Sequence, residues 1–218
     1  RPRALFERFN IEVIATTESP LDDLRWHRMI RESGWGGRVI TAYRPDCVVD
    51  PDFPGFVANL ETFAEITGED CSSWDGYLVA HRMRRDWFKG VGATASGHGH
   101  PNARTENLPR TDAATLFAKV RSGKADLEEA DAFRGQMLTE MARMSLEDGL
   151  VLKIHPGSWR NHNPAVLQRF GRDKGFDLPT RTDYVRALKP LLDAFGTDPR
   201  LSVILFSVIS PTASAELF

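Results

Sequence analysis

Several features that mark whole classes of protein are scarce in these 218 residues. There are only two cysteines, Cys47 and Cys71, which rules out a disulfide framework and makes the reducing cytoplasm the expected compartment. Lys and Arg (28) nearly balance Asp and Glu (30), so nothing in the charge favours nucleic acid or an anionic membrane as a partner. No apolar run approaches the roughly 20 residues that a membrane-spanning helix needs.

Several catalytic motifs are also missing. The chain has no G-x-S-x-G nucleophile elbow, no G-x-x-x-x-G-K-[ST] phosphate loop, no G-x-G-x-x-G fingerprint and no C-x-x-C pair. Serine hydrolase, nucleotide-binding and thiol redox chemistry therefore lack their usual signatures. The composition, 41% hydrophobic and 27% charged, is that of a globular protein.

Short apolar, β-branched runs alternate with segments of helical periodicity. The expected strands are Ile11–Thr16, Arg38–Tyr43, Val91–Ser96, Leu150–His155 and Leu201–Val208. The expected helices are Ser19–Gly34, Phe56–Thr67, Ser73–Lys89, Thr111–Arg121, Asp126–Asp148 and Thr182–Phe195, the last kinked at Pro190. This alternation predicts an α/β fold with a parallel sheet and extra helices, and no linker divides the chain into domains.

In such folds functional groups collect where strands end. Arg44 follows the second strand, and its guanidinium either binds a carboxylate or forms a surface pair with Asp46. His98 and His100 leave the third strand with the His-x-His spacing of metal-binding pairs, although two histidines alone make no metal site.

The fourth strand and the loop after it carry the densest set of polar side chains. Strand alternation places Lys153 and His155 on one face, opposite the apolar Leu152 and Ile154. Arg160, Asn161 and Asn163 follow in the loop. These donors suit the hydroxyl groups and the carboxylate of a sugar acid.

Several co-linear motifs resemble those of the uronate isomerases (glucuronate isomerase), which belong to the amidohydrolase superfamily. The motifs are Leu5–Asp22, Tyr43–Asp46, the loop around His98, Phe133–Leu138, His155–Gly157, Arg160–Asn163 and Gly171–Gly175. They occur in order along nearly the whole chain.

The resemblance implies a fold, an activity and a set of site residues. The fold is a distorted (β/α)₈ barrel with helical insertions, of which residues 1–218 would form a single partial domain, the middle of the barrel with about five strands. The activity is the isomerisation of D-glucuronate to D-fructuronate and of D-galacturonate to D-tagaturonate. By motif, Arg44 matches the arginine that binds the substrate carboxylate, His155 and Arg160 match substrate contacts, and His98 matches a histidine of the corresponding loop. Asn161 joins these as a candidate substrate-binding residue.

The resemblance also implies a divalent metal, zinc, in the complete protein, and we expect a homo-oligomer. The family's metal ligands and catalytic acidic residue lie on barrel strands that precede or follow this chain, so we expect neither here. Gly97 stands where the family usually has Asp, which weakens any polar role at that position.

Two other interpretations stay open. One is a metal-dependent hydrolase of the same superfamily that uses His98 and His100 as ligands. The other is a sugar-acid-binding fragment without catalytic activity.

Overall fold

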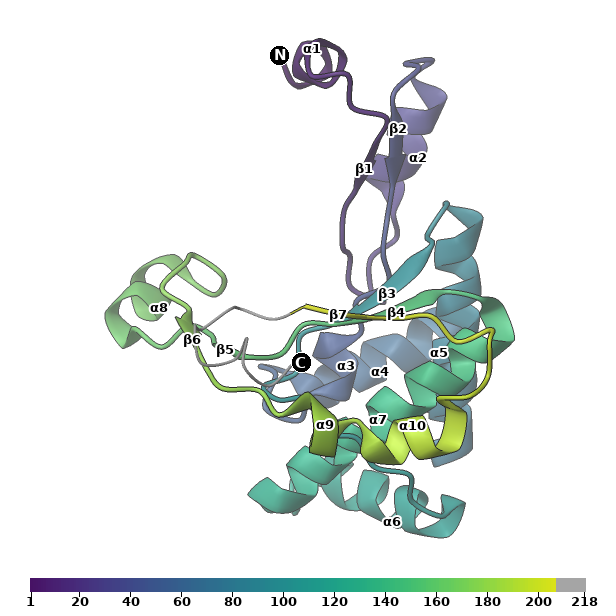
Figure 1. The fold of residues 1–218 in the computed structure, drawn as a ribbon, viewed down its shortest axis with the longest axis vertical. Helices are drawn as coiled ribbons and strands as arrows, with labels where there is room; N and C mark the ends of the chain where they lie inside the picture. The colour runs from purple at the N-terminus through teal and green to yellow at the C-terminus, as the bar shows by residue number, and fades with distance from the viewer. Residues whose placement is uncertain (207–218) are drawn as a thin grey trace.

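The computed structural model describes residues 1–206, in which parallel strands alternate with helices (Figure 1). The elements up to the third strand are α1 (Pro2–Arg8), β1 (Val13–Ala15), α2 (Arg25–Glu32), β2 (Arg38–Ile40), α3 (Asp46–Val49), α4 (Phe56–Thr67), α5 (Trp74–Gly90) and β3 (Ala95–His98). The later elements are α6 (Arg110–Arg121), α7 (Leu127–Asp148), β4 (Val151–Ile154), β5 (Ser158–Trp159), α8 (Pro164–Phe170), β6 (Leu178–Pro179), α9 (Tyr184–Ala187), α10 (Lys189–Phe195) and β7 (Val203–Leu205).

The expected strands are neighbours in one parallel series. β1 pairs with β2, and β3, β4 and β7 form a second sheet in that order. Tyr43 joins the two sheets, because its backbone forms parallel bridges with Glu18 on one side and Ser96 on the other. The predicted α/β class with parallel strands is therefore confirmed.

The side chain of Tyr43 is as firmly fixed as its backbone. Its hydroxyl lies 2.6 Å from Nδ1 of His81 on α5, and both residues are fully buried. The ring of Phe88 meets that of Tyr43 edge-on at 5.2 Å. The junction between the sheets is thus bound to the helix that packs beneath it.

Aromatic and methionine side chains fill the core between the sheet and its helices. Phe117 of α6 stacks between Tyr77 of α5 and Phe133 of α7, with ring centroids 4.6 and 5.8 Å away. On β4 the side chains alternate as expected, with Leu152 and Ile154 fully buried and their neighbours only partly so. In Figure 1 most of the helices lie below β3, β4 and β7, while β1, β2 and α2 extend above them.

Capping residues set the limits of the two longest helices, α7 and α5. Asp126 and Glu129 form a reciprocal capping box at the start of α7, and Gly149 ends that helix in the left-handed conformation. Ser73 caps α5, and α4 has the limits expected for it.

The helix expected from Ser19 was placed too early, since α2 begins only at Arg25. The Ser19 hydroxyl and the Asp22 carboxylate instead accept hydrogen bonds from the backbone N–H groups of Leu21 and Leu24, which holds the segment in turns. Arg84 of α5 also donates to the carbonyl oxygens of Pro20 and Asp22, at 2.8 and 2.7 Å. These carbonyl groups are therefore bonded to α5.

Three further expectations need correction. The segment 182–195 forms two helices, α9 and α10, because Pro190 lacks the N–H group that would continue the first one. β3 begins at Ala95, because Val91 still caps α5 and Gly92 has φ +100°. The short antiparallel strands β5 and β6 were not expected.

The last expected strand is only partly described. β7 covers Val203–Leu205, and residues 207–208 of that expectation lie outside the described residues. No helix within residues 1–206 has the length and apolar character needed to cross a membrane.

Replacing Tyr43 by Phe tests the junction. The buried Nδ1 of His81 would lose its partner, so the free energy of unfolding of the full-length protein should fall by about 1–3 kcal/mol in urea denaturation. Tyr184→Phe is the control, because its hydroxyl group bonds at the exposed surface and its loss should cost about 0.5 kcal/mol or less. Equal losses for both variants would contradict a special role for the Tyr43 junction.

Candidate active site

A cavity of about 230 Å³ opens where β2 and β3 end and the loop after β4 folds over them. Its lining combines arginines, carboxylates, hydroxyl groups and one histidine: Thr17, Ser19, Arg44, Asp46, Cys47, Asp50, Phe53, Gly99, His100, Arg160, Arg172 and Asp173. Such a mixture of donors and acceptors can bind a small, polar, anionic molecule.

Arg44 lies in this wall directly after the Tyr43 junction. Its Nε donates to Oδ2 of Asp46 at 2.8 Å, so the expected pair forms and one edge of the guanidinium is occupied. The arginine side chain remains one-third exposed. Carboxylate binding and ion pairing are therefore compatible at Arg44, since a guanidinium carries five N–H donors.

Asp46 ties the ends of two strands together. Its Oδ2 accepts from Arg44, while Oδ1 accepts from the backbone N–H of Gly99 at 3.1 Å. A Cβ atom at Gly99 would lie only 2.7 Å from Nη2 of Arg44, 2.8 Å from Oδ2 of Asp46 and 3.1 Å from Cε1 of His155. Glycine is thus required at residue 99 for these three side chains to approach one another.

His155 is half-buried beside this group, although it is not itself among the residues that line the cavity. Burial, and next the positive charge of Arg44, lower the pKa of His155 from 6.5 to about 4. The imidazole is therefore neutral at pH 7, with one N–H donor and one acceptor nitrogen.

The loop after β4 contributes Arg160 but not all of its neighbours. Arg160 lines the cavity and approaches Asp177 and Asp173 at 3.6 and 3.8 Å. Asn161 does not line the cavity, and its side-chain Oδ1 accepts a hydrogen bond from the backbone N–H of Asp173 at 2.8 Å. Asn163 caps α8. The expected donor cluster is therefore divided between the cavity and the support of its own loop.

His98 and His100 lie near each other, with ring centroids 5.8 Å apart. His98 is fully buried, does not line the cavity, and shares a 3.1 Å hydrogen bond between Nε2 and the Ser96 hydroxyl. Burial above all lowers the pKa of both histidines. Within residues 1–206 no three His, Cys, Asp or Glu side chains gather in a way that could hold a metal, so the pair has no third ligand there.

Sequence reasoning missed several lining residues, notably Asp50, Phe53 and Arg172. Arg172 stacks on the ring of Phe53 at 4.8 Å, although the two lie far apart in sequence. Asp50 is held by Arg134 of α7, whose Nη1 donates to Oδ1 at 2.8 Å. Arg134 and Arg172 lie in two of the motifs that resemble those of the family. Those motifs could have identified both residues as part of the site.

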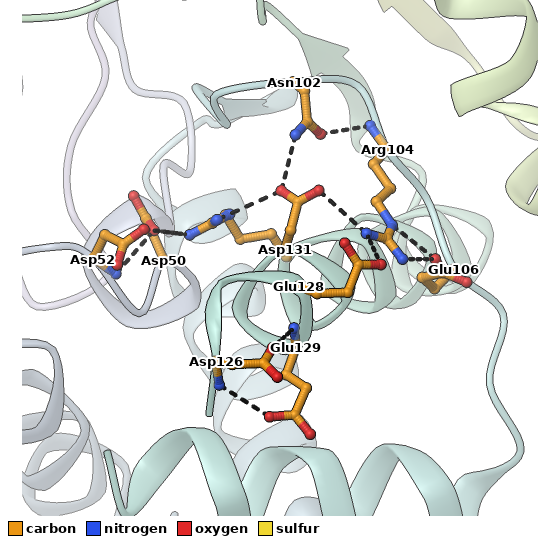
Figure 2. A network of polar contacts seen from close by, with 10 residues as sticks. Asp50, Asp52, Asn102, Arg104, Glu106, Asp126, Glu128, Glu129 and Asp131 are labelled. Atoms are coloured by element: carbon orange, nitrogen blue, oxygen red, sulfur yellow. Dashed lines mark hydrogen bonds and ion pairs between the residues drawn. The ribbon is translucent and has the colours of Figure 1, made fainter. Parts of the chain in front are cut away.

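Figure 2 shows a wider polar network, of which Asp50 also lines the cavity. Arg134 also pairs with Asp52 at 3.0 Å and approaches Asp131 at 3.5 Å. Asp131 in turn accepts from the Asn102 amide at 2.8 Å and pairs with Arg104. The segments after β2 and β3 are in this way attached to the start of α7.

The depressed pKa of His155 can be tested in the full-length protein. A ¹⁵N-edited NMR titration should show its imidazole protonating near pH 4 rather than near 6.5. Arg44→Gln should raise this midpoint, because it removes a nearby positive charge and leaves the carboxylate of Asp46. Arg82→Gln is the control and should leave the midpoint of His155 unchanged, because Arg82 pairs with Glu147. An unchanged midpoint in Arg44→Gln would contradict the effect of the Arg44 charge on the pKa of His155.

The lowered pKa of His155 also makes the free energy of unfolding depend on pH. The pKa of His155 in the folded state lies below its unfolded value, so its contribution to stability is complete above about pH 6.5. That contribution is lost progressively as the pH falls toward 4.

Comparisons with known proteins agree with this arrangement. A family model described as glucuronate isomerase matches residues 1–217. The uronate isomerase of Mesorhizobium japonicum is 67% identical over 217 residues, which are 100% of this chain and 46% of that protein. The chain thus spans about half the length of the curated relatives it matches.

Solved structures give the same result. The crystal structure of glucuronate isomerase from Caulobacter crescentus matches with a TM-score of 0.95 and 58% identity, over 100% of this chain and 45% of that one. Uronate isomerase from Thermotoga maritima matches with a TM-score of 0.89 and 27% identity, over 97% of this chain and 47% of that one. On this evidence the chain belongs to the glucuronate isomerase family.

Proposed function

We propose that the complete protein is a uronate isomerase, which interconverts D-glucuronate and D-fructuronate, and D-galacturonate and D-tagaturonate, in sugar-acid breakdown. The observation that supports this most directly is the cavity at the strand ends, where Arg44 and Arg160 face a space also lined by hydroxyl groups. Membership of the glucuronate isomerase family supports the same activity.

The proposed fold of the complete protein is a distorted (β/α)₈ barrel, of which this chain forms one continuous part. The parallel order β1-β2-β3-β4-β7, with Tyr43 at the junction, supports this proposal. A barrel has eight strands, and the carboxyl ends of its strands form the active-site face. The cavity described above lies at that end of β2 and β3.

In this proposal the residues of the chain bind and orient the substrate. Arg44 and Arg160, which line the cavity, hold its carboxylate. The neutral imidazole of His155, which lies beside the lining residue Gly99, bonds one of its hydroxyl groups. The reaction moves a proton from C2 to C1 through a cis-enediol, while the hydroxyl proton on C2 is lost and the C1 oxygen is protonated. Holding the distant carboxylate keeps C1 and C2 in place during these transfers.

The divalent metal, zinc, remains a proposal about the complete protein. The described residues do not fit a metal site, because His98 and His100 lack a third ligand among residues 1–206. The metal-dependent hydrolase that would use this pair is accordingly not favoured. The cytoplasmic location is proposed from the free, buried Cys47 and Cys71, and the homo-oligomer remains a proposal as well.

Kinetics of the full-length enzyme test the assigned roles. Arg44→Ala and Arg160→Ala should each lower kcat/KM for D-glucuronate by about 30-fold or more, through a higher KM and a lower kcat, because a charged contact to the carboxylate is lost. Arg200→Ala is the matched control, since Arg200 pairs with Asp198 at the surface, and it should leave both constants unchanged.

Unaltered constants in Arg44→Ala would show that the carboxylate binds elsewhere. Binding of D-glucuronate without turnover by the wild-type protein would instead support a sugar-acid-binding protein.

A further inference from the structure

His100 is a buried polar residue whose partners are missing. Only 4% of its surface is exposed, and it lines the cavity. Within residues 1–206 neither of its ring nitrogens has a hydrogen-bond partner. His81, which is equally well buried, has its Nδ1 bonded to Tyr43, and His98 has its Nε2 bonded to Ser96. Two unpaired nitrogens in one buried ring are costly, unless a ligand in the cavity completes them.

The loop that carries His100 is attached on both sides of it. Before His100, the Gly99 N–H donates to Asp46. After it, the Asn102 amide donates to Asp131, and Arg104 pairs with Glu106 and Glu128, as Figure 2 shows. The backbone on both sides of His100 is therefore held beside the cavity, and a movement of the loop toward solvent would break these contacts.

The electrostatic setting keeps the ring uncharged. Burial lowers the pKa of His100, whereas the nearby carboxylates of Asp46 and Asp50 raise it to a smaller extent, and Arg134 and Asp131 act more weakly in opposite directions. A neutral imidazole offers one donor and one acceptor. A sugar hydroxyl group likewise donates and accepts, so the two match.

We propose that His100 binds the hydroxyl-bearing part of the sugar acid, while Arg44 and Arg160 hold its carboxylate. The proposal rests on the proposed uronate isomerase function and adds a substrate contact to it. It assigns His100 to hydroxyl recognition, whereas the sequence suggested it only as one of two metal ligands.

The decisive experiment compares one substitution at two buried histidines in the full-length enzyme. His100→Leu removes two unpaired polar atoms, so Tm should stay constant or rise, while KM for D-glucuronate rises and kcat/KM falls about tenfold or more. His81→Leu, the control for stability, breaks the bond to Tyr43, so its Tm should fall.

The outcomes separate the two proposals. A wild-type enzyme that converts uronates, with a His100→Leu variant of equal kcat/KM, would overturn the role of His100 and leave the proposed function intact. A wild-type enzyme that converts neither D-glucuronate nor D-galacturonate would overturn both.

If His100→Leu fails to fold, His100→Phe decides the question. Its ring carries neither nitrogen, so it cannot form the proposed hydrogen bonds. A raised KM at unchanged Tm would then support the contact, and an unchanged KM would contradict it.

Discussion

The site depends on the position of one residue, Tyr43. Its backbone N–H donates to Ala95 and its carbonyl oxygen accepts from Gly97, each within 3.0 Å, while Arg44 donates to Glu18 on the other side. These bonds join the β1–β2 pair to the sheet of β3, β4 and β7. The buried hydroxyl bonds His81, so that the junction cannot shift without moving α5. The side chains at the ends of β2 and β3 are therefore positioned by the Tyr43 junction.

That junction brings the ends of the strands together. The polar groups at these ends then hold one another in place through hydrogen bonds. Arg44 follows Tyr43 directly, and Asp46 bonds both Arg44 and the backbone of Gly99. The backbone of His155 bonds the carbonyl oxygen of His98, which brings the end of β4 to the same place. The cavity combines arginines that can hold an anion with hydroxyl and imidazole groups that can bond a polyol, as a uronate requires.

Much of the fold could be predicted from local chemistry. The capping box at Asp126, the cap at Ser73 and the stop at Gly149 set the limits of their helices through contacts only a few residues apart. The predicted start at Ser19 was wrong because Arg84, more than 60 residues later, bonds the carbonyl groups that the prediction assigned to a helix. Contacts of that separation leave no local signal.

The same distinction applies to the candidate site. Arg44 and Arg160 could be predicted because they follow strands and lie in motifs typical of the family, and both line the cavity. Asp50 could not, since its place in the wall is held by Arg134, 84 residues away. Asn161 follows the same strand as Arg160 but does not line the cavity, and its side-chain oxygen supports the loop through its bond to Asp173.

In the proposed function, the cavity between β2, β3 and the loop after β4 holds the sugar acid. A crystal structure of the full-length protein with bound D-glucuronate tests it most directly. We expect the carboxylate within hydrogen-bond distance of Arg44 and Arg160, and hydroxyl groups facing His155 and His100. A uronate bound elsewhere, in contact with none of these four side chains, would show that the cavity is not the substrate site.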